Sequence, residues 1–374
     1  MTESQERLTL IRDALGAAPA AYLRAPGRVN LLGGHVDYHE GHVVAMAIDR
    51  DVVVGLRPAA DGRVRVKSLD LAGPVDVAAD GSTDARTVEP AWGRLVAGVV
   101  STLALAGRPS VGMDAVVSTN LAIGAGLSSS AAFEVAIALA LARAAGWDTD
   151  MRSLARACQQ AELDATGVPC GIQDQLVALA GVADHALAID CRDLTIEALR
   201  LPPGVAVLVV HSGVPRTLAG SEWAARRAES EAAAAALGLR VLRDASPADV
   251  ADHPRARHVV AEIARVEAFA DALRHGEVDR LGQLMLEGHA SLRDDMEVST
   301  PELDTLVECL VDAGAFGARL TGGGFGGCAV ALVPEGRAPS IAEHASTQYR
   351  ARTHREPRPF LVRAAVGAGL LASD

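Results

Sequence analysis

Two glycine-rich segments carry the residue types that most readily bind a phosphate group. The first, Gly124-Ala-Gly-Leu-Ser-Ser-Ser-Ala131, lies between a stretch typical of a strand and one typical of a helix. Backbone N–H groups at a helix N-terminus attract anions, and serine hydroxyls add donors or a metal ligand. A plain helix cap with serine filler would use the same residues, so both interpretations stay open from the sequence. A G-x-x-x-x-G-K-S/T loop is excluded, because no lysine follows these glycines.

The second segment is Gly322-Gly-Gly-Phe-Gly-Gly327. Each ordered glycine costs about 0.5–1 kcal/mol relative to alanine, so such density suggests that something approaches this backbone closely. A flexible hairpin is the alternative. The strand-like residues 328–333 that follow favour an ordered loop.

Four side chains outside these segments could take part in phosphoryl transfer. Arg28, His35 and Asp37 stand within ten residues of one another, and Asp174 follows a turn at Gly171. A carboxylate and an arginine on loops can act as a general base and a charge stabiliser. Taken singly, each is more typical of a surface ion pair. The histidines have no H-x-x-x-H spacing, which argues against a histidine metal site.

The periodicity of apolar residues predicts the elements that must position these side chains. Segment 24–41 is too rich in Gly, Asp and His for a helix or a buried strand, so we expect a loop there. Strands are predicted at 43–56, 64–66, 111–118, 205–210 and 328–333, and helices at 5–16, 92–106, 131–145, 151–166, 221–237, 257–274, 278–292 and 300–314.

This mixture of strands and helices predicts an α+β chain. Pro202-Pro-Gly204 breaks the chain, which places the domain junction between residues 1–200 and 201–374. The length of 374 residues suits two domains or one large one, and 49% apolar with 22% charged residues indicates a folded soluble protein.

The formal net charge of −12 argues against nucleic acid and anionic membranes as partners. No stretch approaches the roughly 20 apolar residues that span a bilayer. The N-terminal residues lack an apolar signal region, and five scattered cysteines suit reduced thiols, so we expect a cytoplasmic protein.

Together the motifs resemble those of the GHMP kinase superfamily, and specifically of the galactokinases. The segment Arg24-Ala-Pro-Gly-Arg-Val-Asn-Leu-Leu-Gly-Gly-His-Val-Asp-Tyr38 is similar to the galactokinase signature P-G-R-V-N-L-I-G-E-H-T-D-Y. Segment 124–131 is similar to the family's phosphate loop, and segment 320–328 to its third motif. Segments 167–175, 218–222 and 291–304 match as well, so the resemblance covers nearly the whole chain.

The resemblance implies a two-domain GHMP kinase fold with the active site in the interdomain cleft. It implies an ATP-dependent sugar-1-kinase in which Asp174 deprotonates or orients the anomeric hydroxyl and Arg28 stabilises the transferring phosphoryl group. Mg²⁺ would be held by Ser130 and Glu162. The implied ATP-binding residues are Gly124, Gly126, Leu127, Ser128, Ser129, Ser130 and Ala131, with Trp92 near the adenine, and the implied sugar contacts include His35, Asp37 and Gly171.

Three departures from the family pattern concern the sugar pocket. Gly34 stands where galactokinases have Glu, Trp223 where they have Tyr, and Gln173 where they have Met. The Glu and the Tyr are sugar contacts in the family, so the resemblance implies an intact ATP site and an altered sugar pocket.

Galactose or a galactose-like hexose is the first expectation for the substrate. A C6-modified sugar such as galacturonate, an amino sugar, or a non-catalytic role as a sugar sensor are the alternatives. If the altered pocket matters, Gly34→Glu should favour galactose over galacturonate. The oligomeric state is left open by the sequence.

Overall fold

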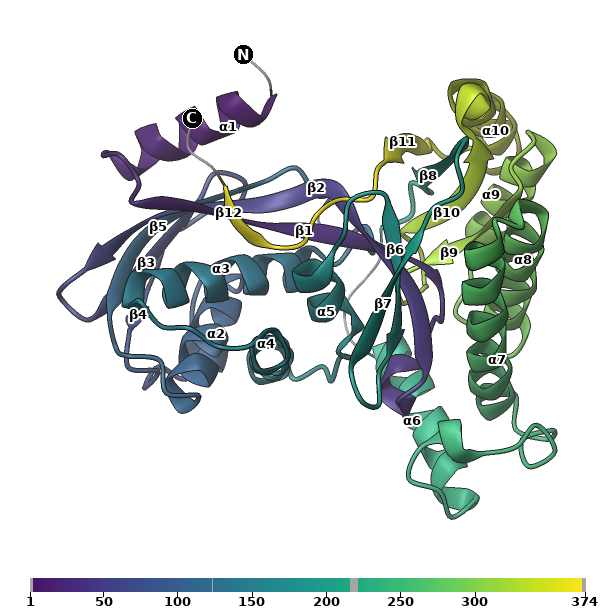
Figure 1. The fold of residues 1–374 in the computed structure, drawn as a ribbon, viewed down its shortest axis with the longest axis horizontal. Coiled ribbons are helices and arrows are strands. Elements are labelled where there is room, and N and C mark those ends of the chain that lie inside the picture. The colour runs from purple at the N-terminus through teal and green to yellow at the C-terminus, as the bar shows by residue number, and fades with distance from the viewer. Residues whose placement is uncertain (1–2, 123, 216–220, 372–374) are drawn as a thin grey trace.

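The computed structural model describes residues 3–122, 124–215 and 221–371. Within them the chain forms two β-sheets with helices packed on both (Figure 1). No helix in these ranges is long and apolar enough to cross a membrane.

The larger sheet has eight strands in the order β12-β1-β2-β5-β3-β4, and β6 pairs with both β2 and β7. Every pairing is antiparallel except β3 with β5. Its strands are β1 (Ala21–Leu32), β2 (His42–Ala59), β3 (Arg63–Ser68), β4 (Val75–Ala78), β5 (Gly112–Thr119), β6 (His185–Asp190), β7 (Thr195–Arg200) and β12 (Gly369–Leu371). The long β2, rich in valine, forms the centre of this sheet.

The prediction of a loop over residues 24–41 is wrong for its first part, because β1 is a largely buried strand. Its pairing with β2 shifts register between Pro26 and Arg28, and such an irregularity tolerates a proline that has no N–H to donate. A Cβ on Gly27 would lie 2.7 Å from the Leu127 carbonyl oxygen, so glycine lets β1 pass close to the phosphate loop. After β1 the chain forms the loop 33–36 and the short 3₁₀ helix η1 (Asp37–His39).

Five helices belong to the half of the molecule that holds the larger sheet, and α3 runs along the sheet (Figure 1). The helices of this half are α1 (Glu3–Leu15), α2 (Gly93–Leu105), α3 (Ser129–Ala145), α4 (Met151–Thr166) and α5 (Gln173–Ala180), with the 3₁₀ helix η2 (Ala85–Thr87) before α2. The alanines of α3 allow close packing, and ten of its residues are buried.

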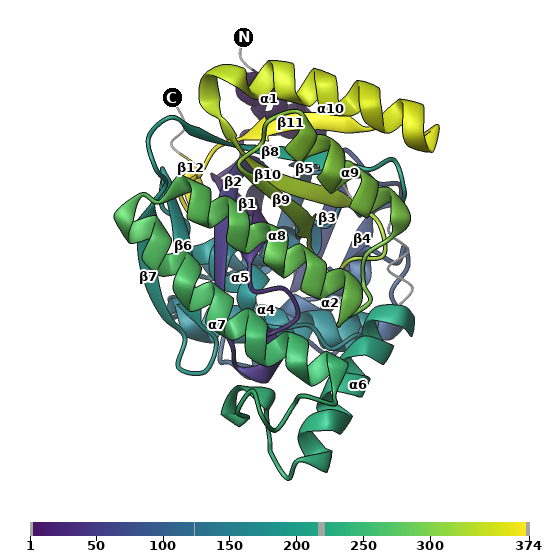
Figure 2. The same cartoon turned by 90° about the vertical axis from the view of Figure 1, so that its right-hand side faces the viewer.

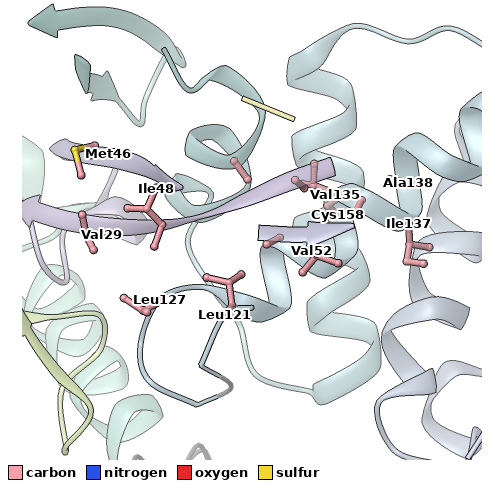
Figure 3. Packing of buried hydrophobic residues seen from close by; sticks show 14 of the residues in the cluster. Val29, Met46, Ile48, Val52, Leu121, Leu127, Val135, Ile137, Ala138 and Cys158 are labelled. Atoms are coloured by element: carbon pink, nitrogen blue, oxygen red, sulfur yellow. The ribbon is translucent and has the colours of Figure 1, made fainter. Parts of the chain in front are cut away.

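The glycine-serine loop before α3 is anchored in the apolar core at both ends. Leu121 and Leu127 are almost fully buried and lie beside the strands that carry Val29 and Val52 (Figure 3). The residues at its two ends are therefore fixed by the core.

The smaller sheet has the order β11-β8-β10-β9, with every pair antiparallel. Helices α8, α9 and α10 pack on this sheet, and α7 packs against α8 (Figure 2). The strands are β8 (Val205–His211), β9 (Gly317–Thr321), β10 (Cys328–Pro334) and β11 (Arg358–Val362), and the helices are α6 (Ser221–Ala236), η3 (Leu242–Asp244), α7 (Pro254–His275), α8 (Val278–Asp294), α9 (Pro301–Asp312), η4 (Glu335–Arg337) and α10 (Ala338–Thr353).

The chain does not divide between the two sheets at a single point. β12 comes last yet pairs with β1 in the larger sheet. The domain boundary between residues 200 and 201 stays a prediction.

Candidate active site

One cavity of about 370 Å³ collects most of the predicted site residues. This volume lies in the range of small-molecule sites. The cavity is lined by segments of both halves of the chain, including β1, the loop before α3, the start of α6 and the glycine loop after β9. Among the predicted residues its walls include Arg28, Gly34, His35, Asp37, Trp92, Gly124, Gly126, Ser128, Ser129, Ser130, Glu162, Gly171, Asp174 and Trp223. Leu127 and Ala131 do not line it, because both side chains are packed in the protein interior.

Arg28 and Asp174 form a two-pronged ion pair at the centre of the cavity. The Arg28 Nε and Nη2 atoms each donate to one Asp174 oxygen at 2.7 Å, and Nη1 donates to the Gly126 carbonyl oxygen. Arg28 is 6% exposed, whereas the Asp174 side chain is 30% exposed because it faces the cavity. Such a fixed guanidinium can stabilise charge that develops on a transferred phosphoryl group.

Ser128 directs its hydroxyl to Asp174 and does not cap α3. It adopts a left-handed conformation with φ of 57°, uncommon for a residue other than glycine, and its Oγ donates to Asp174 Oδ2. Burial alone would raise the pKa of Asp174, but Arg28 and the hydrogen bonds from Ser128 and Gln173 outweigh it and lower the pKa. The carboxylate form is therefore favoured.

Ser130 and Glu162 lie together on the cavity wall. Ser130 Oγ donates to Glu162 Oε1 at 2.9 Å, and Gln175 Nε2 donates to both Glu162 Oε2 and the buried Glu134. Burial raises the pKa of Glu162 and the pKa of Glu134. A cation beside them would relieve the cost of these buried carboxyl groups.

The oxygens of Ser130 and Glu162 fit a magnesium ion. Mg²⁺ prefers oxygen ligands and takes few of them from the protein, with water and phosphate oxygens completing the shell. Within residues 3–122, 124–215 and 221–371 no group of three or more His, Cys, Asp or Glu side chains could hold a metal ion. One carboxylate and one hydroxyl beside the glycine-serine loop suit a cation that arrives with a nucleotide.

The two glycine loops touch each other. A Cβ on Gly126 would lie 3.1 Å from the Thr321 carbonyl oxygen, and one on Gly322 would lie 3.0 Å from the Gly126 carbonyl oxygen. Both residues have positive φ, at 83° and 80°. The close approach expected for the second glycine loop is therefore to backbone, which makes it an ordered part of the cavity wall and not a flexible hairpin.

Asp37 and Gly171 meet at the end of the cavity assigned by resemblance to the sugar. A Cβ on Gly171 would overlap the Asp37 carboxylate, so glycine is required for this contact. Burial, and then the charge of Asp174, raise the pKa of Asp37 to about 6. Its carboxylate can accept hydrogen bonds from sugar hydroxyls once it is ionised.

Aromatic rings surround the same end. His35 lies between Tyr38, whose hydroxyl is 3.1 Å from His35 Nδ1, and the Gly323 carbonyl oxygen, which is 3.2 Å from Nε2. The Trp223 ring packs against both His35 and Tyr38. Residues 218–220 of the matching segment 218–222 lie outside the described residues.

Gly34 lines the cavity, but a side chain at this position would point elsewhere. A Cβ would lie 3.1 Å from Arg319 Nη2 and 3.4 Å from Leu292, and neither residue lines the cavity. Arg319 is buried and paired with Glu262, whose Oε1 also accepts the N–H groups of Gly33 and Gly34. This geometry argues against the expectation that a glutamate at position 34 would place its carboxylate against the sugar.

Trp92 also lines the cavity. Its ring meets Phe133 edge-on and its Nε1 donates to the Ala72 carbonyl oxygen. The sequence analysis missed the neighbouring wall residues Ser68, Asp70, Leu71, Leu95, Thr119 and Phe133. They come from four elements and loops, and no spacing in the sequence connects them.

Three family profiles match the chain. The galactokinase galactose-binding signature matches residues 12–58, the GHMP kinase N-terminal domain matches 94–182, and the GHMP kinase C-terminal domain matches 269–351. Arg28 and Asp37 fall within the first match, and Asp174 within the second.

Solved structures with the same fold include several kinases. A *Lactococcus lactis* galactokinase complexed with galactose shares 27% identity over 99% of this chain and 100% of its own, with a TM-score of 0.93. The *Methanococcus jannaschii* mevalonate kinase shares 18% identity (92% and 98% coverage, TM-score 0.66). A D-glycero-D-manno-heptose 1-phosphate kinase from *Bacteriodes thetaiotaomicron* shares 15% (95% and 99%, TM-score 0.62). The last two show the fold alone.

The three matches follow one another along the chain in the order of the fold, and the galactokinase likeness extends over its whole length. GHMP kinases use ATP. The chain belongs to the GHMP kinase superfamily, and within it this protein is a galactokinase-like sugar kinase.

Proposed function

We propose that this enzyme transfers the γ-phosphoryl group of ATP to the anomeric hydroxyl of galactose or a galactose-like hexose. The observation that carries the proposal is the Arg28–Asp174 pair, which faces the same cavity as the glycine-serine loop. A carboxylate for the acceptor hydroxyl and donors for phosphate are thereby within one small-molecule site. The galactose in the similar *Lactococcus* structure supports a hexose as the acceptor.

Asp174 acts on the acceptor hydroxyl. Its lowered pKa makes it a weak base, so it first accepts a hydrogen bond from the C1 hydroxyl and takes the proton as the new O–P bond forms. The bond between the γ-phosphorus and the bridging oxygen of ATP breaks in the same step, and ADP leaves. Positioning supplies much of the rate, as is general for phosphoryl transfer.

Arg28 and the glycine-serine loop receive the negative charge. The guanidinium is fixed by Asp174 and the Gly126 carbonyl oxygen, so it needs no reorganisation during the reaction. The residues that would hold Mg²⁺ are Ser130 and Glu162. When bound, Mg²⁺ would neutralise part of the phosphate charge.

The proposed sugar site lies between Asp37, Gly171, His35 and Trp223, with the backbone of Gly34 beside it. Asp37 accepts hydrogen bonds from ring hydroxyls, and the Trp223 ring offers an apolar face to the sugar. Its cavity is lined by a carboxylate and aromatic rings, which suits a neutral hexose better than a uronate.

A kinase assay over a panel of free sugars tests the proposal, with ADP release and the sugar 1-phosphate as readouts. Galactose, 2-deoxygalactose, galactosamine, galacturonate and glucose cover the substrate alternatives. We expect phosphorylation of galactose at C1, with Asp174→Asn as the inactive control. Binding of sugar and ATP without turnover would identify a sensor, and a preference for galacturonate would overturn the neutral-hexose assignment.

A further inference from the structure

Two buried amide side chains, those of Asn30 and Gln173, form a row of hydrogen bonds that ends at Asp174. Asn30 Nδ2 donates to Gln173 Oε1 at 2.6 Å, and Gln173 Nε2 donates to Asp174 Oδ1 at 3.2 Å. Asn30 is 6% exposed and Gln173 is 4% exposed. Both side chains reach the cavity wall from different elements, β1 and α5.

Asp174 fixes the direction of this row. A carboxylate only accepts hydrogen bonds, so the Gln173 amide must turn its nitrogen to Asp174 and its oxygen to Asn30. Asn30 must then turn its own nitrogen to Gln173. As a result Asn30 Oδ1 is buried without a hydrogen-bond partner among the residues that the structure describes. A buried unpaired acceptor is destabilising, so the row is kept at a cost in stability.

The two oxygens of Asp174 accept hydrogen bonds from different donors. Oδ1 accepts from Arg28 Nε and Gln173 Nε2, and Oδ2 accepts from Arg28 Nη2 and the Ser128 hydroxyl. A carboxylate has about four lone-pair positions, so all are used. Arg28 is held by Gly126 and Gln173 by Asn30, whereas a serine hydroxyl can rotate away. Oδ2 is the oxygen at which an incoming hydroxyl can replace a donor.

We propose that Gln173, held by Asn30, is a positioning residue that occupies Oδ1 of Asp174 and so directs the acceptor hydroxyl to Oδ2. The inference rests on the proposed function, in which Asp174 receives that hydroxyl. The sugar hydroxyl takes the place of the Ser128 hydroxyl, and the transferred proton ends on Oδ2. A methionine, which the resembling motif has at position 173, has no N–H to donate and leaves both oxygens open.

The effect of a substitution at position 173 depends on the charged groups around Asp174. They are Arg28 of β1, Asp37 of η1, Glu134 of α3 and Glu162 of α4. Gln173→Met removes a hydrogen-bond donor from Asp174 and adds no charge to these surroundings. Gln173→Glu goes further, because an ionised carboxylate beside Oδ1 repels Asp174, whereas a protonated one can still donate to it.

Two variants and a control test the inference with galactose and ATP as substrates. Gln173→Met should lower kcat by about tenfold, the order expected for one hydrogen bond to a charged group, with the KM for ATP unchanged. The kcat of Gln173→Glu, divided by that of the wild type, should rise as the pH falls from about 8.5 to about 5.5, because protonation restores the donor. Gln160→Met, at an exposed position of α4, should behave as wild type.

The possible results separate this inference from the proposed function. If the wild type phosphorylates a sugar and Asp174→Asn does not, but Gln173→Met keeps the wild-type kcat, the role of Gln173 is wrong and the proposed function stands. The role of Gln173 is also wrong if the ratio of the Gln173→Glu kcat to the wild-type kcat does not change with pH. This second measurement tests the role even if Gln173→Met does not fold. A wild type inactive on every sugar overturns both.

Discussion

At the scale of single residues, the ion pair between Arg28 and Asp174 gives its two members different tasks. Asp174 meets the acceptor hydroxyl, and Arg28 holds that carboxylate ionised while presenting positive charge to the phosphoryl group. Replacing either residue therefore removes a different part of the reaction.

Asp174→Asn should lower kcat by about 10²–10⁴, the usual loss for a general base, because an amide keeps the shape but takes no proton. Calorimetric titration with a non-hydrolysable ATP analogue should show nearly unchanged nucleotide affinity. A variant with wild-type kcat would remove Asp174 from the mechanism.

Arg28→Lys should also lower kcat strongly, although it keeps the charge. An ammonium group cannot donate to both Asp174 oxygens and to the Gly126 carbonyl oxygen in one plane as the guanidinium does. Steady-state kinetics should show the loss in kcat, with a smaller change in the KM for ATP. A change confined to the sugar KM would instead make Arg28 a substrate clamp.

Asp37 should make sugar binding depend on pH. Burial, with the Asp174 charge, raises the pKa of Asp37 to about 6, so its carboxyl is neutral below that pH and ionised above it. Because only the carboxylate accepts hydrogen bonds well, the sugar KM should fall as the pH rises from about 5 to about 7.5. The KM for ATP should not follow this curve. Asp37→Asn should give a sugar KM that is independent of pH across this range.

At the scale of elements, a glycine at the entry to α5 decides where the carboxylate of η1 lies. A Cβ on Gly171 would overlap the Asp37 carboxylate. Gly171→Ala should therefore raise the sugar KM about tenfold or more through displacement of Asp37, a change that requires no unusual backbone angle at this residue. The KM for ATP and the melting temperature should change little. Gly336→Ala, where a Cβ meets nothing within 4 Å, is a matched control.

The sequence predicted the elements whose apolar pattern is long and regular. Helices α2, α3 and α4 and strands β2, β5, β8 and β10 lie where the pattern placed them, within a few residues. Strand β1 was missed because segment 24–41 was taken as one unit, and its glycines, histidines and aspartate lie mostly at 33–41, after the strand. Within the strand, Arg28 pairs with Asp174 and Asn30 donates to Gln173, and both partners are far away in the chain.

Short or polar elements carried too little pattern to be recognised. Strand β7 is mostly exposed, β12 has three residues, and α10 contains few large apolar side chains. For the site, the motifs located most of the residues around the cavity but not their contacts. The hydrogen bond from Ser128 to Asp174 and the group of wall residues named with Trp92 depend on tertiary structure that no local spacing encodes.

At the scale of the whole molecule, one buried carboxylate, that of Glu262, connects the two halves of the chain. Glu262 of α7 accepts the N–H groups of Gly33 and Gly34, which follow β1, and pairs with Arg319 of β9 at 2.8 Å. The charge of Arg319 holds the pKa of Glu262 far below its usual range in spite of the burial that raises it. The loop that carries His35 and Asp37 is thereby tied to the smaller sheet.

Arg319→Met should lower the free energy of unfolding by about 3–5 kcal/mol, because it leaves the Glu262 charge buried without its main partner. Urea unfolding measures the change. Glu262→Gln combined with Arg319→Met should recover part of the loss. Arg274→Met, which breaks the exposed pair with Glu197, is the matched control and should cost no more than about 1 kcal/mol. If Arg319→Met and Arg274→Met lowered the free energy of unfolding equally, the buried pair would have no special importance for stability.

The pairing of β12 with β1 affects how the protein must be made. Residues 369–371 cover the outer edge of β1 at Tyr22, Leu23 and Arg24, and β1 has no other partner on that side within the described residues. While a nascent chain is still growing on a ribosome, this edge has unpaired N–H and C=O groups that another unfinished chain can pair with. This edge therefore stays open to aggregation until residues 369–371 have been synthesised and have paired with it.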